Sequence, residues 1–218
     1  IKNLDLALEV NLYRNKFMKK IEYYMSHGSP WTFLGHKRIN KIASENNCEL
    51  ILMPVNYGEI FPATGGLPVN KRPIQRQKYR LQELSRWSEF LKVKLNTEPK
   101  FFPSRSLLPS LAIISAKMLK YDNVMDIAYR IMEALWVKEL DIDDEETLKS
   151  IISKLIPTAE ELIDFSKQEK VSNEIKKNTE KALKSSVFGA PTYIIDEEVF
   201  WGQDRLDFVE RYIKRQSG

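Results

Sequence analysis

The sequence predicts an α/β protein with one four-stranded sheet and a long helical insertion, and three observations carry that prediction. Near the start, residues 21–25 alternate in strand-forming residues and residues 49–55 form an apolar run, with a helical segment between them. Near the end, residues 192–195 and 199–201 have a hairpin pattern, and a helix follows over residues 205–215. Nearly everything between residues 107 and 188 has helical periodicity, so we expect the middle of the chain to be an insertion.

The first helix is predicted over residues 30–45 because a strong start signal precedes it. Ser29 is a favourable N-cap, and Pro30 suits the first helical position because its fixed φ is compatible with a helix. The residues expected to face the core from this helix are Phe33, Leu34, Ile39 and Ile42. A strand, a helix and a buried strand in this order are expected to form a parallel pair with a right-handed crossover.

Two loops are predicted, over residues 57–73, which are rich in Gly and Pro, and over residues 98–104, which contain two prolines. A helix is predicted between them, over residues 75–91. Further helices are expected near residues 107–120, 122–137, 144–155, 158–168 and 171–187. The residues expected as N-caps in this block are Asp144, Thr158 and Ser172.

Composition excludes several classes of protein. Of 218 residues, 43% are hydrophobic and 29% charged, as in an ordinary soluble globular protein. The net charge of +4 is spread along the chain, which weighs against nucleic-acid binding. The single cysteine allows no intrachain disulfide, and two histidines are too few for most metal sites, so no metal is expected.

No apolar run approaches the roughly 20 residues of a membrane span, so no membrane association is expected. We expect a cytoplasmic protein. The chain starts at Ile1 rather than Met, which suggests truncation or processing, and an organelle such as the mitochondrion stays open as its location.

The order of strands and helices is that of a thioredoxin-like frame, whose reactive group lies where the first strand meets the first helix. Free N–H groups at a helix start favour a thiolate or another anion. Residues 29–32 read Ser-Pro-Trp-Thr, without a pair of cysteines, and Cys48 lies a full helix away. Disulfide exchange on protein sulfur is therefore excluded here, and a reactive thiol must arrive with a ligand. Ser29 is either that sulfur's hydrogen-bond partner or only a helix cap.

Two more places in this frame carry candidate chemistry. Pro191 precedes a predicted strand, where thioredoxin-like folds have a cis-proline, and the residue before it, Ala190, then offers its backbone to a peptide-like ligand. At the end of the hairpin, Asp204 stands at or near the N-cap of the last helix, and an aspartate there can also bind an α-amino group.

Residues 29–35 (SPWTFLG), 188–192 (FGAPT) and 200–206 (FWGQDRL), supported by residues 60–65, 86–87 and 101–103, resemble a known family. These stretches are similar to 2-hydroxychromene-2-carboxylate isomerases and the related kappa-class glutathione transferases. The resemblance covers about residues 20 to 216 and implies a thioredoxin-like fold with a DsbA-like all-helical insertion. It suggests an N-terminal helical extension over residues 1–18, a thioredoxin-like domain over 19–75 and 186–218, and an insertion over 76–185.

The resemblance also implies glutathione as cofactor and assigns roles to residues. Ser29 would be the catalytic residue that stabilises the thiolate, and Pro30 and Trp31 would line the sulfur site. The residues that would bind the rest of glutathione are Ala190, Pro191, Gln203, Asp204, Arg205 and Arg76. Gly66 stands where the kappa class has Asn, and the family's lysine for the glycyl carboxylate is replaced by Arg76 or displaced to Lys71.

The implied reaction is a cis–trans isomerisation in the catabolism of aromatic compounds. The thiolate would add reversibly to a small aromatic or unsaturated acid, a double bond would become a rotatable single bond, and elimination would return the thiol. Trp31 and Phe61 could line the substrate slot or the core, and Trp201 is expected in the core. Two alternatives stay open: a transferase or peroxidase-like enzyme on other electrophiles, and a non-enzymatic glutathione or peptide binder. A homodimer is possible, as among kappa-like relatives.

Overall fold

The computed structural model describes residues 19–215, and the predicted extension over residues 1–18 lies outside them. The strands are β1 (Lys20–Met25), β2 (Glu49–Pro54), β3 (Thr192–Ile195) and β4 (Glu198–Trp201). They form one sheet in the order β2-β1-β3-β4. The β1–β2 pair is parallel, while β3 is antiparallel to both β1 and β4. This topology confirms the predicted frame.

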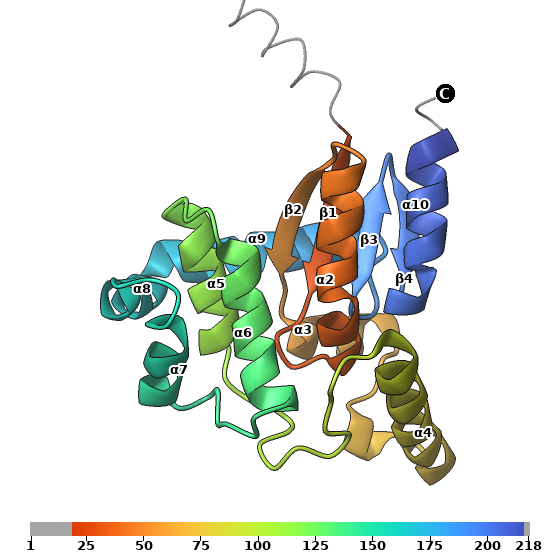
Figure 1. The fold of residues 1–218 in the computed structure, drawn as a ribbon, viewed down its shortest axis with the longest axis horizontal. Helices are drawn as coiled ribbons and strands as arrows, with labels where there is room; N and C mark the ends of the chain where they lie inside the picture. The colour runs from red at the N-terminus through yellow and green to blue at the C-terminus, as the bar shows by residue number, and fades with distance from the viewer. Residues whose placement is uncertain (1–18, 216–218) are drawn as a thin grey trace, which may run out of the picture.

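The two faces of the sheet are covered by different helices, because alternate residues of β1 point to opposite sides. Tyr23 lies in a core cluster with residues of α2 (Pro30–Glu45) and α10 (Leu206–Arg215), and Tyr24 lies in a second cluster with residues of α9 (Glu169–Lys184). Figure 1 shows α2 and α10 in front of the sheet and α9 behind it. The core residues predicted on α2 are confirmed as buried: Phe33, Leu34, Ile39 and Ile42.

The helical middle of the chain is also confirmed. Its helices are α4 (Ile74–Leu91), α5 (Leu108–Met118), α6 (Val124–Trp136), α7 (Glu145–Ile152) and α8 (Ala159–Ser166). Asp144 caps α7 as predicted, and Thr158 stands at the N-cap of α8 without a capping hydrogen bond. The prediction that Ser172 is an N-cap is wrong, because α9 begins at Glu169 with Gln168 at its N-cap, and Ser172 lies inside the helix. The core cluster of Tyr23 continues into α5, α6, α7 and α8, and the predicted domain boundaries stay a prediction.

The structure corrects one predicted loop. Residues 57–73 contain the helix α3 (Tyr57–Thr64) and the short 3-10 helix η1 (Val69–Lys71). Asn56 caps α3 by accepting a hydrogen bond from Gly58 N–H, and Gly65 ends the helix in the left-handed region at φ 75°. The glycines and prolines that predicted a loop therefore lie largely at the ends of short helices, where they are equally favourable.

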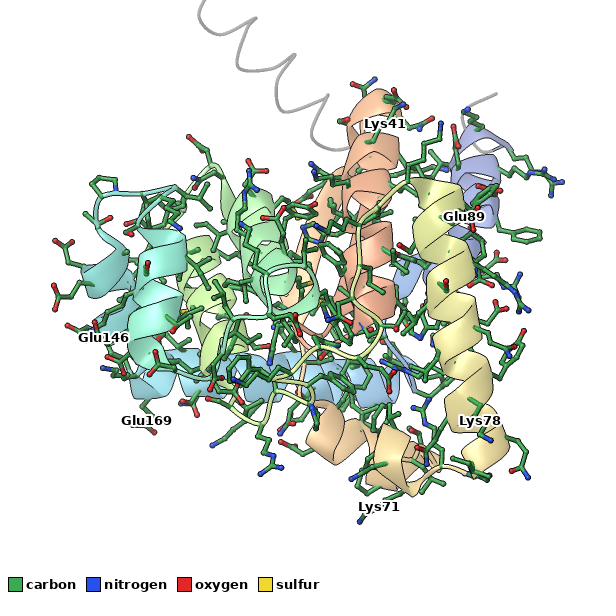
Figure 2. All side chains as sticks on the ribbon, turned by 60° about the horizontal axis from the view of Figure 1, so that its bottom comes forward. Lys41, Lys71, Lys78, Glu89, Glu146 and Glu169 are labelled. Atoms are coloured by element: carbon green, nitrogen blue, oxygen red, sulfur yellow. The ribbon has the colours of Figure 1, made fainter. Side chains whose placement is uncertain are left out.

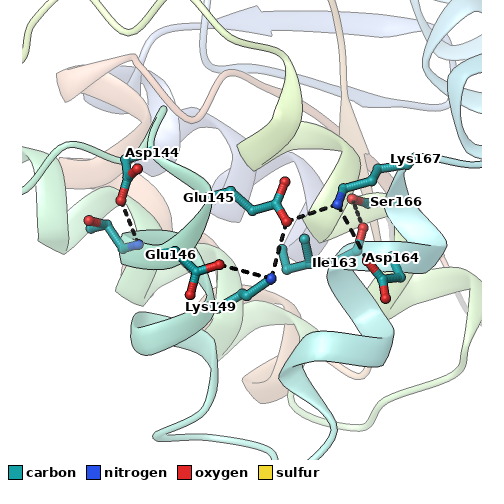
Figure 3. Close-up of polar contacts among 9 residues, drawn as sticks. Asp144, Glu145, Glu146, Lys149, Ile163, Asp164, Ser166 and Lys167 are labelled. Carbon is teal, nitrogen blue, oxygen red and sulfur yellow. Dashed lines mark hydrogen bonds and ion pairs between the residues drawn. The ribbon is translucent and has the colours of Figure 1, made fainter.

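Charged side chains cover the surface with both signs interspersed. In Figure 2 the labelled Lys and Glu side chains project outward from helices on different sides of the molecule. Figure 3 shows how such charges join two helices of the insertion: Glu145 of α7 pairs with Lys149 on its own helix and with Lys167, just after α8. Across residues 19–215, no helix is both long and apolar enough to cross a membrane.

Candidate functional site

Ser29 ends the turn between β1 and α2 and contacts two distant parts of the chain. Its Oγ accepts a hydrogen bond from Thr32 N–H at 3.2 Å, which caps the helix. The same hydroxyl donates to the carbonyl oxygen of Ala190 at 3.4 Å, a long and therefore weak hydrogen bond. A stronger acceptor that reached this turn would compete with the Ala190 carbonyl for the Ser29 proton.

The first turn of α2 offers a free backbone donor beside Ser29. Phe33 N–H is bonded to the Ser29 carbonyl, and Pro30 has no N–H. Within the described residues, nothing accepts a hydrogen bond from Trp31 N–H. The positive end of the helix dipole, which lies at the same turn, also stabilises negative charge. A negatively charged atom at this turn would therefore meet Trp31 N–H, the Ser29 hydroxyl and a favourable field.

The segment before β3 presents its backbone to the same turn. The Ala190–Pro191 peptide bond is cis, as predicted. The Ala190 carbonyl accepts only from Ser29, and its N–H has no partner among residues 19–215. The segment is fixed from both sides, because Tyr57 Oη donates to the Gly189 carbonyl at 2.8 Å and Gly202 N–H donates to the Pro191 carbonyl at 2.9 Å. Ala190 thus offers one donor and one acceptor, as an extended peptide would need.

The turn after β4 brings Gln203 against α2. A Cβ built on Gly35 of α2 would lie 2.8 Å from Gln203 Cβ, so the two elements touch only because residue 35 is glycine. Gln203 is buried, and its Oε1 accepts from the Arg38 guanidinium at 3.2 Å. Its Nε2 is buried and has no hydrogen-bond partner within residues 19–215. This leaves an unused amide donor at the edge of the candidate site.

Asp204 and Arg205 are exposed next to Gln203 and pair with each other at 3.6 Å. Asp204 lies near the start of the last helix, as expected, but its side chain makes no capping hydrogen bond there. The residues 203–205 form a 3-10 helix, η2, with Gly202 at its N-cap and no side-chain cap, and α10 follows directly. Gly202 has φ 105°, and a Cβ there would collide with Asp204 Oδ1. The Asp204 carboxylate therefore lies close over Gly202.

Within residues 19–215, no side-chain hydrogen bond or ion pair joins the other predicted residues to this cluster. Pro30 is buried and Trp31 half-buried in the first turn of α2. Arg76 lies exposed in the first turn of α4, and its guanidinium makes no hydrogen bond or ion pair with residues 19–215. Lys71 projects outward from η1 in Figure 2. The role of Arg76 or Lys71 toward a carboxylate stays a prediction.

Trp201 is not a core residue. Its side chain is 51% exposed and packs edge-on against Phe188, with ring centroids 4.7 Å apart. Gly189 lies under the indole so closely that a Cβ there would collide with it. The prediction that Trp201 lies in the core is wrong, because β4 is an edge strand whose residues are mostly exposed.

The sequence reasoning missed a partly buried chain of hydrogen bonds that begins two residues before Ser29. Ser104 donates to Asp143 Oδ1 at 2.5 Å, so it accepts from His27 Nε2–H at 2.9 Å. His27 Nδ1 then accepts from Ser110 at 2.7 Å. Burial lowers the pKa of His27 to about 4, which keeps the imidazole neutral. His27 stands two residues before Ser29, but its partners lie far along the chain and no local pattern marks them.

Arg38 was missed for a similar reason. It lies on α2, and its guanidinium donates both to the backbone carbonyl and to the side chain of Gln203 and pairs with Asp207. Tyr57, which lies in the segment predicted as a loop, was also missed.

Residues 19–215 contain no cluster of three His, Cys, Asp or Glu side chains that could hold a metal ion. Burial raises the pKa of Cys48, which lies beyond the far end of α2.

The sheet order, the helix start at Ser29 and the cis-proline opposite it define a thioredoxin-like protein without a redox cysteine at the helix start. The chain matches the model of the DSBA-like thioredoxin domain over residues 20–214 and belongs to that family. It is 26% identical over 196 residues to a 2-hydroxychromene-2-carboxylate isomerase of Sphingobium xenophagum, covering 89% of this chain and 98% of the relative. It is 23% identical over 203 residues to human glutathione S-transferase kappa 1, covering 88% and 89%.

Two solved structures have a similar fold. A 2-hydroxychromene-2-carboxylate isomerase matches with a TM-score of 0.77 and 20% identity, over 91% of this chain and 96% of the other. The cytosolic disulfide reductase DsbM from Pseudomonas aeruginosa with GSH matches with a TM-score of 0.63 and 14% identity, over 90% and 98%. These likenesses show the fold.

Proposed function

We propose that this protein is a glutathione-dependent enzyme whose thiol site is the first turn of α2. The observation that carries the proposal is the contact between the Ser29 hydroxyl and the Ala190 carbonyl, which joins the start of α2 to the backbone of Ala190. Within residues 19–215 neither Trp31 N–H nor Ala190 N–H has a hydrogen-bond partner. A protein cysteine is absent from this turn, so the thiol must come with a ligand. The curated relatives named as isomerases and glutathione transferases support this class of ligand.

The residues present fit glutathione in their donor and acceptor pattern. Ala190 offers an N–H and a carbonyl that a peptide backbone can pair with, and Ser29 and Trp31 N–H offer donors to a thiolate. Asp204 offers an exposed carboxylate to an α-amino group, while the unpaired Gln203 Nε2 and the Arg205 guanidinium offer donors to a carboxylate. We assign Arg76 to the glycyl carboxylate, for which a bidentate guanidinium is suited.

Bound glutathione supplies a nucleophilic thiol, and this chain's residues set the state and place of that sulfur. Ser29 and Trp31 N–H lower the thiol pKa by donating to the anion, and the α2 dipole acts in the same direction. Ala190 and the turn at Gln203 fix the tripeptide, so that the sulfur meets a second substrate in one orientation. The proposed reaction is the cis–trans isomerisation of a small unsaturated aromatic acid of the 2-hydroxychromene-2-carboxylate type.

A transferase acting on other electrophiles is the second candidate, because the thiol site would be the same and relatives named kappa-class transferases cover the chain to the same extent. The experiment measures isomerisation of 2-hydroxychromene-2-carboxylate and conjugation of chlorodinitrobenzene, each with and without reduced glutathione. Isomerisation that requires glutathione supports the first candidate, and conjugation alone supports the second. Glutathione binding without either reaction would contradict an enzymatic role toward these substrates, and no binding at millimolar glutathione would contradict the proposal as a whole.

A further inference from the structure

A pocket lies beside α4, and its lining includes none of the residues that hydrogen-bond with Ser29. It has a volume of about 220 Å³ and is lined by residues of η1, of the first half of α4 and of the segment 97–102. Figure 1 shows the start of α4 at the same end of the sheet as α3 and the first turn of α2. The volume is below the roughly 300–1,000 Å³ of sites for drug-sized ligands, so the pocket fits a smaller molecule.

Arg80 lines this pocket, and its charge has no partner in the described structure. The residue is 8% exposed, yet its guanidinium makes no hydrogen bond or ion pair with residues 19–215, and Nη2 is wholly buried. Two aromatic rings lie near it, with the guanidinium carbon 5.1 Å from the ring centre of Phe102 and 5.9 Å from that of Trp136. The indole Nε1 of Trp136 is a second buried donor beside Arg80 that has no hydrogen-bond partner within residues 19–215.

An unpaired buried cation is costly, so this arrangement calls for a counter-charge. Burial and the nearby Arg72 lower the pKa of Arg80 to about 10, while Glu98 acts to raise it. The group therefore stays charged at neutral pH. Glu98 lines the pocket, but within residues 19–215 it forms no ion pair with Arg80. An anion entering the pocket would gain the hydrogen bonds that no side chain of the described chain supplies.

We propose that the Arg80 pocket binds the carboxylate of a small organic acid with a flat apolar body. The planar guanidinium can donate two parallel hydrogen bonds to a carboxylate, and Gln77 and Thr97 are further polar groups on the wall. The remaining lining is apolar and suits a ring or a short chain: Val69, Leu81, Pro99 and Phe102. Glu98 adds a negative charge to the wall, which disfavours a doubly charged anion such as phosphate.

This inference does not depend on glutathione, because neither Arg80 nor the other lining residues belong to the proposed thiol site. The probe is benzoate, and benzamide is its neutral counterpart of nearly the same shape. Both are titrated calorimetrically into the wild-type protein and into Arg80→Gln, with inorganic phosphate as a third ligand. Thermal unfolding of each protein, with and without ligand, reports whether the variant is folded and whether binding stabilises it.

We expect benzoate to bind the wild type at least tenfold more tightly than benzamide and phosphate, and to raise its Tm. In Arg80→Gln the benzoate affinity should fall at least tenfold and the Tm shift should vanish. Equal binding of benzoate and benzamide by the wild type would overturn the proposal without any variant. Tighter binding of phosphate, unchanged benzoate binding in folded Arg80→Gln, or no benzoate binding by the wild type would overturn it as well.

Discussion

The Ser29 hydroxyl lies 3.4 Å from the carbonyl oxygen of Ala190, a residue 161 positions later in the chain. This contact joins the start of α2 to the segment that holds the cis-proline. It also occupies the one proton that Ser29 could donate to a ligand sulfur. Ligand binding at this turn should therefore exchange a weak internal hydrogen bond for a stronger one to an anion, and at the same time free the Ala190 carbonyl for a peptide N–H.

Gly35→Ala should separate α2 from Gln203. The added Cβ would lie 2.8 Å from Gln203 Cβ and 3.0 Å from Tyr193 Oη. Alanine would favour the helix by about 0.5–1 kcal/mol, but overpacking costs about 1–3 kcal/mol, so we expect a net destabilisation of about 1–2 kcal/mol. Urea denaturation measures it, and glutathione affinity should fall severalfold because Gln203 moves.

Gly28→Ala is the matched control for Gly35→Ala. Its added Cβ would meet nothing closer than 3.9 Å. We expect the stability of this variant to stay within about 0.5 kcal/mol of the wild type. Equal stability of both variants would show that the contact between α2 and Gln203 is not tight.

Tyr57→Phe should loosen the segment that presents Ala190. The substitution removes a hydrogen bond of 2.8 Å to the Gly189 carbonyl, which keeps its second bond from Thr192 Oγ1. Because the carbonyl stays paired, the expected loss of stability is about 1 kcal/mol, measured by denaturant unfolding. Tyr79→Phe is the control, because this side chain is exposed and makes no hydrogen bond with residues 19–215, and it should leave the stability unchanged. An unchanged stability of Tyr57→Phe would contradict the bracing role of Tyr57.

The two histidines should make the protein less stable at mildly acidic pH. Burial lowers the pKa of both His27 and His36 from 6.5 to about 4. The unfolded chain then binds more protons than the folded one, so the free energy of unfolding falls as pH decreases from about 6.5 towards 4. Each histidine contributes a slope of at most about 1.4 kcal/mol per pH unit in this window.

Denaturant unfolding at pH 7, 6 and 5 measures this slope. His27→Gln should be less stable than the wild type at pH 7, because it disturbs the bonds to Ser104 and Ser110, and should show a shallower decline. A wild-type stability that is flat between pH 7 and 5 would mean that both imidazoles accept a proton in the folded state.

The sequence was sufficient for the frame because each part of it has a local signal. The strand patterns, the Ser29-Pro30 helix start and the proline before β3 are all readable within a few residues. The helix α3 was not predicted, because its capping glycine and its internal proline are residue types that are also common in loops. Trp201 was misplaced because an aromatic residue in a strand pattern does not tell an edge strand from a central one.

The supporting residues of the site could not be predicted, because each acts through a partner that is distant in sequence. Arg38 contacts Gln203, which follows the insertion, and His27 contacts Ser104 and Ser110. Neither pair has a characteristic spacing. Arg80 shows the same limit, since an arginine on a helix is usually exposed and only the packing of Phe102 and Trp136 reveals its burial.

A titration with reduced glutathione tests the thiol site at Ser29, with binding followed by calorimetry and thiolate by its ultraviolet absorbance. Ser29→Ala loses both the sulfur donor and a helix cap worth about 1 kcal/mol. Asp144→Ala is the matched control, because Asp144 caps α7 through Thr147 N–H, as Figure 3 shows, and lies in the insertion. We expect thiolate at neutral pH in the wild type and in Asp144→Ala, and its loss in Ser29→Ala, which still binds glutathione. Undiminished thiolate in Ser29→Ala would contradict the role of Ser29, and failure of the wild type to bind glutathione would contradict the thiol site itself.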